Sequence, residues 1–129
     1  MILMKDIIRE GHKTLVTVAK EVNLPLSNAD IKLAYDLMEY VQNSQNDELA
    51  EKYKLRPGVG LAAPQINVSK RMFAMHCNDF DGTLYSHVMI NPVIEGRTNE
   101  VTFLPDGEGC LSVDRETNGV TPRYFGIKI

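Results

Sequence analysis

The sequence of 129 residues contains no tryptophan, only two cysteines and only three histidines. Two cysteines are too few for a disulfide framework, so we expect both to be thiols in a reducing cytoplasm. No apolar run approaches the roughly 20 residues that a transmembrane helix needs, and the opening Met1-Ile2-Leu3-Met4 is too short for the apolar core of a signal peptide. A net charge of −3 gives no general attraction to nucleic acid or to anionic lipid, so we expect neither as a partner.

The three histidines do not have the spacing of a helical metal site. His12, His76 and His87 include no pair at positions i and i+4, the spacing that aims two imidazoles from one helix face at a metal ion. His76 and Cys77 are neighbours in a predicted strand, so their side chains should point to opposite faces. We therefore expect the histidines to be structural residues, and the pattern His-Glu-x-x-His is absent from these residues.

The residues that are present predict one α+β domain over 1–129, because 43% hydrophobic and 24% charged residues are ordinary values for a globular protein. Apolar spacing predicts a helix over Asn28–Asn43 with Ser27 as its N-cap, and a shorter helix over Glu48–Tyr53. Short strands bounded by glycine, proline and asparagine follow, over Arg71–Cys77, His87–Ile94, Val101–Leu104 and Tyr124–Ile129. Helices followed by strands indicate an antiparallel or mixed sheet.

The segment Gly58-Val59-Gly60-Leu61-Ala62-Ala63-Pro64-Gln65 is suited to bringing the backbone close to a ligand. Its two glycines can adopt torsions that other residues avoid, and its two alanines add little bulk. Gln65 then presents an amide that can donate a hydrogen bond. The Gly-x-Gly pattern alone is equally typical of a tight structural turn.

A second segment, Glu108-Gly109-Cys110-Leu111-Ser112, contains the more reactive of the candidate groups. A lone cysteine is most often a small buried hydrophobic residue. The neighbouring glycine and acid suit instead a thiolate that meets a metal ion in a place that substrate can reach. Both interpretations are open from the residues of this segment.

Together the two segments resemble the first two signature segments of the peptide deformylases, which are metal-dependent amidases. The resemblance continues through Asn91-Pro92 and Pro122-Arg123-Tyr124, and the longer segment before Gly58 is similar to the longer-looped deformylases of Gram-positive bacteria. The third signature, a helical His-Glu-x-x-His, is not found. We therefore expect a C-terminally truncated member of the family that lacks the metal-binding helix.

The resemblance implies a role for each matching residue. Cys110 would be one of three protein ligands of a metal ion, Fe²⁺ in the complete enzyme with Zn²⁺, Ni²⁺ or Co²⁺ as alternatives, and water would take the fourth position. Gln65 and the backbone N–H of Leu111 would stabilise the oxyanion that forms on the formyl carbonyl. The positions implied to bind substrate are Val59, Gly60, Gly109 and Arg123. Arg123 is equally open to interpretation as a solvated charge, and Glu108 is expected to anchor its loop.

Three functions remain open. The first is an incomplete deformylase that would hydrolyse the N-formyl group of N-formylmethionyl peptides, including nascent chains at the ribosome. With one thiolate and no general base, it should bind metal weakly or not at all and release no formate. The second is a non-catalytic paralogue that binds peptides, and the third is a sensor based on the Cys110 thiol. A missing helix would also expose apolar sheet surface, so we expect a homo-oligomer.

Overall fold

Helix α1 (Asn28–Ser44) is the longest element of the computed structural model, which describes all 129 residues. Ser27 caps it, because its Oγ accepts a hydrogen bond from the N–H of Asp30 at 3.1 Å and donates one to Oδ2 of Asp30 at 2.7 Å. Helix α2 (Asp47–Tyr53) follows after a short turn. Both helices confirm the sequence prediction to within one residue at each end. No helix has the length and apolar character needed to cross a membrane.

Three antiparallel strands form the main sheet in the order β1 (Gly60–Ala62), β2 (Met72–Asn78), β3 (Leu84–Ile90). Strand β2 is shifted by one residue from its prediction, but β3 begins before the predicted His87 and ends before the predicted Ile94. It ends at Ile90 because Asn91 turns the chain with a φ of 50° and the following proline cannot donate to the ladder. Strand β1 lies in the glycine-rich segment, where local propensity gives no signal and pairing with β2 decides the conformation.

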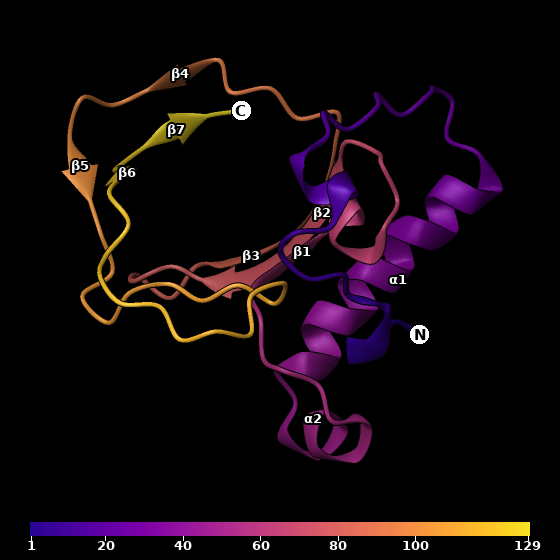
Figure 1. Cartoon of the computed structure of the whole chain (residues 1–129). Helices are drawn as coiled ribbons and strands as arrows, with labels where there is room; N and C mark the ends of the chain where they lie inside the picture. Colours follow the sequence, from indigo (N-terminus) through magenta and orange to yellow (C-terminus); the bar gives the residue numbers. More distant parts are fainter.

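The core lies between α1 and this sheet (Figure 1). Leu37, Tyr40 and Val41 on α1 are fully buried, and they are in the same cluster as Leu61 of β1. The remaining buried hydrophobic residues are Ile2, Ile7, Val22, Leu55, Ala63, Met72, Ala74 and Leu111. Leu111 is the only core member after Ala74, so it connects the Cys110 segment to the core.

Residues 91–104 and 120–129 form a long arm that extends away from this core (Figure 1, orange to yellow), while the Cys110 segment between them returns to the core through Leu111. Two short ribbons build it: β4 (Gly96–Arg97) pairs with β7 (Ile127–Lys128), and β5 (Val101–Thr102) pairs with β6 (Arg123–Tyr124). The single strand predicted over Tyr124–Ile129 is therefore wrong, because the chain changes partner between β6 and β7. Strand β5 is also shorter than predicted. The α+β fold class with antiparallel strands is confirmed.

Candidate active site

Gln65 and Cys110 lie on the wall of the same cavity, which has a volume of about 440 Å³. The Nε2 atom of Gln65 lies 3.9 Å from Sγ of Cys110. Six of the seven site residues expected from the sequence line this cavity: Val59, Gly60, Gln65, Gly109, Cys110 and Leu111. The fold therefore joins the two segments, which are far apart in the sequence, into one site.

The carboxamide of Gln65 is fixed at both of its polar atoms. Its Oε1 accepts a hydrogen bond from the N–H of Ala62 at 3.0 Å, and its Nε2 donates one to Oγ of Ser112 at 3.2 Å. The backbone carbonyl of Gln65 also accepts a hydrogen bond from the N–H of Ile8 at 2.8 Å. An NH₂ group carries two protons, and the second one of Gln65 makes only a long contact with Sγ of Cys110 at 3.9 Å, which the oxygen of a ligand could replace.

Cys110 is an exposed free thiol, and Cys77 on β2 is a half-buried free thiol. The exposure of Cys110 excludes the interpretation of this residue as a buried hydrophobic side chain. Its neighbour Leu111 is buried, so the loop turns the leucine side chain into the core and leaves the thiol at the cavity. Gly109 adds no side chain that would block the approach to the thiol.

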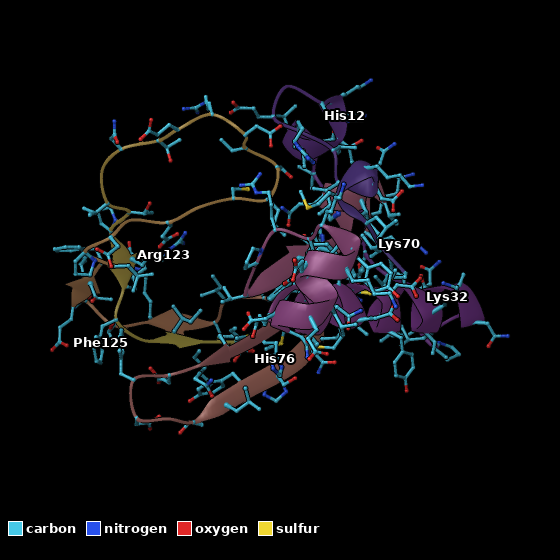
Figure 2. The ribbon with its side chains drawn as sticks, turned by 90° about the horizontal axis from the view of Figure 1, so that it is seen from below. His12, Lys32, Lys70, His76, Arg123 and Phe125 are labelled. Carbon is cyan, nitrogen blue, oxygen red and sulfur yellow. The ribbon has the colours of Figure 1, made fainter.

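Arg123 does not line the cavity that holds Gln65. It projects from β6 in the arm (Figure 2). Its guanidinium donates two hydrogen bonds to the carboxylate of Glu108, from Nε to Oε1 at 2.7 Å and from Nη2 to Oε2 at 2.6 Å. The hydrogen bond to Arg123 holds the pKa of the Glu108 carboxyl below its usual value, and the same contact raises the pKa of Arg123. Glu108 thus anchors the loop, as expected. A contact between Arg123 and substrate remains a prediction.

Two residues that sequence reasoning missed hold the site in place. Gln45, just after α1, donates hydrogen bonds from Nε2 to the carbonyl oxygens of Gly58 at 2.9 Å and His76 at 2.7 Å. Arg56 contacts the loop that carries Cys110. Gln45 lies in a polar run without any distinguishing signal. Only its position directly before Pro57-Gly58 could have pointed to Arg56.

The residues present do not form a metal site by themselves. No group of three or more His, Cys, Asp or Glu side chains is arranged to hold a metal ion. His12 and His76 lie on opposite sides of the molecule (Figure 2), and Nδ1 of His76 is already hydrogen-bonded to Oγ of Ser86 at 2.8 Å. Cys110 can supply one thiolate, and one ligand does not hold a divalent ion tightly.

Comparison with known proteins identifies the class of molecule to which this fold and site belong, which is a hydrolase. Residues 4–129 match the model of the polypeptide deformylase family. The chain is 57% identical to peptide deformylase 2 of Bacillus cereus and 53% identical to peptide deformylase 2 of Bacillus subtilis. Each match covers all of this chain and 70% of the relative. The chain belongs to the polypeptide deformylase family.

Solved structures agree with this assignment. The peptide deformylase of Ehrlichia chaffeensis matches with a TM-score of 0.69 and 26% identity, over 98% of this chain and 66% of that one. The class I type b peptide deformylase of Acinetobacter baumannii, in a crystal structure with Met-Ala-Ser bound, matches with a TM-score of 0.65 and 27% identity. That match covers 92% of this chain and 69% of the other.

Proposed function

We propose that the cavity between Gln65 and Cys110 binds the first residues of an N-formylmethionyl peptide and stabilises the charge that develops when its formyl group is removed. The observation that carries this proposal is the carboxamide of Gln65, whose Nε2 lies 3.9 Å from the exposed thiol of Cys110 on the wall of one cavity. The Met-Ala-Ser complex of the Acinetobacter baumannii relative supports a peptide as the ligand. Nascent chains in the cytoplasm would be its natural source.

Deformylation breaks the amide bond between the formyl carbon and the amino nitrogen of methionine. When water adds to the formyl carbon, negative charge develops on the formyl oxygen. We assign the stabilisation of this charge to the N–H of Gln65 on the Cys110 side and to the backbone N–H of Leu111. Donors fixed in advance at such a position are typically worth about 3 kcal/mol each in barrier lowering.

The rest of the wall suits an extended peptide with an apolar first side chain. Val59 is 63% exposed and offers an apolar contact for a methionine side chain. At Gly60 a Cβ would lie 3.2 Å from the carbonyl oxygen of Ala74, so a larger residue would disturb the pairing of β1 with β2. At Gly109 a Cβ would meet nothing within 4 Å, so this position is open toward a ligand.

Cys110 is proposed as one ligand of the family's metal ion, which when bound would supply an activated water. Fe²⁺ is proposed as that ion, with Zn²⁺, Ni²⁺ or Co²⁺ as alternatives. These 129 residues do not bring further His, Cys, Asp or Glu side chains together with Cys110 into a set of three metal ligands. They also bring no carboxylate or imidazole among the residues that line the cavity, so no general base is present there. We therefore propose that they bind the formyl peptide without releasing formate.

The test has two measurements. In an NMR titration with formyl-Met-Ala-Ser, Gln65→Ala should weaken binding about fivefold, the loss of one hydrogen bond. Gln42→Ala, which changes an exposed glutamine on α1, should bind as the unaltered chain does. Formate release with added Fe²⁺ or Ni²⁺ should be absent. A chain that binds no peptide would contradict the proposed ligand, and clear metal-dependent turnover would contradict the proposed inactivity.

We also propose that a second copy of the chain covers the apolar surface of the arm. Five exposed hydrophobic residues line a second cavity of about 440 Å³ there: Ile94, Val101, Tyr124, Phe125 and Ile127. Monomeric proteins rarely leave large contiguous apolar patches in water. The arm also consists of two-stranded ribbons, whose outer edges carry backbone groups that another chain could pair with.

A further inference from the structure

We propose that Arg56 is a positioning residue, which orients the peptide unit between Cys110 and Leu111 so that the N–H of Leu111 faces the cavity. This role rests on the proposed function, because the N–H of Leu111 is the second donor assigned to the formyl oxygen. It adds a residue that makes none of the proposed contacts with the formyl group and lies well before the loop in the sequence.

The guanidinium of Arg56 makes several contacts with one short stretch of the loop. Its Nη2 donates to the carbonyl oxygens of Cys110 at 3.2 Å and Val113 at 3.3 Å. Its Nη1 donates to Oδ1 of Asp114 at 3.0 Å and lies 3.5 Å from the carbonyl oxygen of Leu111. A planar group with five N–H donors can serve such an array of acceptors at once, whereas a lysine ammonium cannot reproduce that geometry.

The contact with the Cys110 carbonyl determines where the next N–H points. The carbonyl of Cys110 and the N–H of Leu111 belong to the same peptide unit, which is planar and trans, so the two groups point in opposite directions. Because Arg56 holds the carbonyl, the N–H of Leu111 is turned away from Arg56. This N–H has no acceptor within the protein, and Leu111 is part of the cavity wall.

Arg56 can exert this control because its own backbone is fixed by the core. Its carbonyl oxygen accepts a hydrogen bond at 3.0 Å from the hydroxyl of Tyr40, which is fully buried. The residue before it, Leu55, is also part of the core. The core between α1 and the sheet thus fixes the backbone of Arg56, and Arg56 in turn fixes the orientation of the Cys110–Leu111 peptide unit.

Asp114 joins Arg56 to a second arginine on the other side of the loop. Its Oδ2 accepts a hydrogen bond from Nε of Arg9 at 2.9 Å, while its Oδ1 is bound to Arg56. The neighbouring backbone N–H of Glu10 donates to the carbonyl oxygen of Ser112 at 2.8 Å. The N-terminal segment and Arg56 therefore hold the loop from two directions.

Arg115 provides a matched control. Like Arg56, Arg115 forms an ion pair with a carboxylate, in this case Glu10 of the N-terminal segment, with Nε 2.7 Å from Oε1. Unlike Arg56, it makes no hydrogen bond to a carbonyl of the loop. Arg56→Lys and Arg115→Lys thus both keep the positive charge and lose the planar donor group. Only the first removes the contacts that orient the Cys110–Leu111 peptide unit.

The experiment compares the affinities of the chain for formyl-Met-Ala-Ser and for Met-Ala-Ser, and measures the residual dipolar coupling of the Leu111 N–H. Arg56→Lys should weaken formyl-Met-Ala-Ser binding about fivefold and leave Met-Ala-Ser binding unchanged, since only the formyl oxygen needs this donor. The Leu111 coupling should change while couplings in α1 do not. Arg115→Lys should alter none of these values.

An unchanged Leu111 coupling, or an equal loss of affinity for both peptides, would overturn the role of Arg56. If the unaltered chain binds neither peptide, the proposed function fails, and the Leu111 coupling still decides whether Arg56 orients the peptide unit. Should Arg56→Lys fail to fold, Asp114→Asn decides the question. It removes the charge that Arg56 binds and should change the Leu111 coupling from its value in the unaltered chain, whereas Arg9→Lys, which alters the other partner of Asp114, should leave that coupling unchanged. An unchanged Leu111 coupling in Asp114→Asn would overturn the role of Arg56.

Discussion

Leu111 occupies the space that a side chain at Gly58 would need. A Cβ at Gly58 would lie 3.1 Å from Cδ1 of Leu111, closer than ordinary carbon contacts allow. The Leu111 side chain is buried and has little room to move. The glycine-rich segment and the cysteine-bearing segment therefore fit together directly, and the position of the Cys110 loop depends on the absence of a side chain at residue 58.

Gly58→Ala should therefore destabilise the protein and shift the NMR signals of Leu111. Replacing glycine by alanine gains about 0.4–1 kcal/mol through the unfolded chain, whereas overpacking a core contact costs about 1–3 kcal/mol, so the loss should prevail. Urea unfolding measures the change. Gly96→Ala is the control, since its Cβ would lie 3.9 Å from Cβ of Lys128, an ordinary contact. Equal stability changes in both variants would contradict a close fit between Gly58 and the Leu111 side chain.

Asp30 should make the stability of the protein depend on acid pH. Hydrogen bonds from Lys70 and from Ser27 hold the pKa of this carboxyl below its usual value. A carboxyl with a lowered pKa in the folded state stabilises the fold above its unfolded pKa, and this contribution is lost as the pH falls through the folded pKa. Asp30→Asn should thus lower the melting temperature at neutral pH, and the difference from the unaltered chain should shrink in acid.

Asp36→Asn is the matched control for this prediction, because Asp36 pairs with Lys32 on the same helix, and the Lys32 side chain is 72% exposed. Figure 2 shows Lys32 and Lys70 on the same side of the molecule. An exposed i,i+4 pair contributes little to stability and is screened by salt. A constant difference in melting temperature between Asp30→Asn and the unaltered chain, from neutral to strongly acid pH, would argue against a linked Asp30 carboxyl.

The sequence predicted the elements whose signal is local. The hydroxyl of Ser27 marks the start of α1 because capping depends on nearby backbone groups. The strand predicted over His87–Ile94 instead ran past the end of β3 at Ile90, which the torsion of Asn91 sets. The sequence could not predict that residues 123–128 would divide between two partners, because pairing is decided by distant strands. The single strand predicted over Tyr124–Ile129 has the right location, but the chain there forms two short strands with different partners.

The same distinction applies to the site. Gln65 and Cys110 were predicted through a resemblance that covers their whole segments, and their proximity in one cavity agrees with it. Arg56 was missed because its contacts join it to a loop that lies far along the chain. The position of Arg56 directly before Pro57-Gly58 is its only local signal, and that position does not indicate a contact with the Cys110 loop.

Tyr40→Phe should destabilise the protein by about 1 kcal/mol, the usual net contribution of one hydrogen bond. The buried hydroxyl donates to the carbonyl oxygen of Arg56 at 3.0 Å, and phenylalanine would fill the same space without that donor. Urea unfolding should show a lower midpoint with an unchanged m-value. Tyr35→Phe serves as the control because the Tyr35 side chain is 74% exposed. A Tyr40→Phe variant with the stability of the unaltered chain would show that the hydroxyl does not help to fix Arg56.

The apolar arm leads to a prediction about assembly. Phe125 is 69% exposed in the second cavity, while Phe80 is 97% exposed at the turn between β2 and β3 and does not line that cavity. If a second copy covers the arm, Phe125→Ser should lower the mass measured by light scattering toward that of one chain. Phe80→Ser removes a similar apolar side chain and should leave the mass of the oligomer unchanged, because its position is outside the proposed contact. If exposed apolar surface drives association, the fraction of oligomer should rise with protein concentration. A mass equal to one chain for the unaltered protein at all concentrations would therefore contradict the assembly.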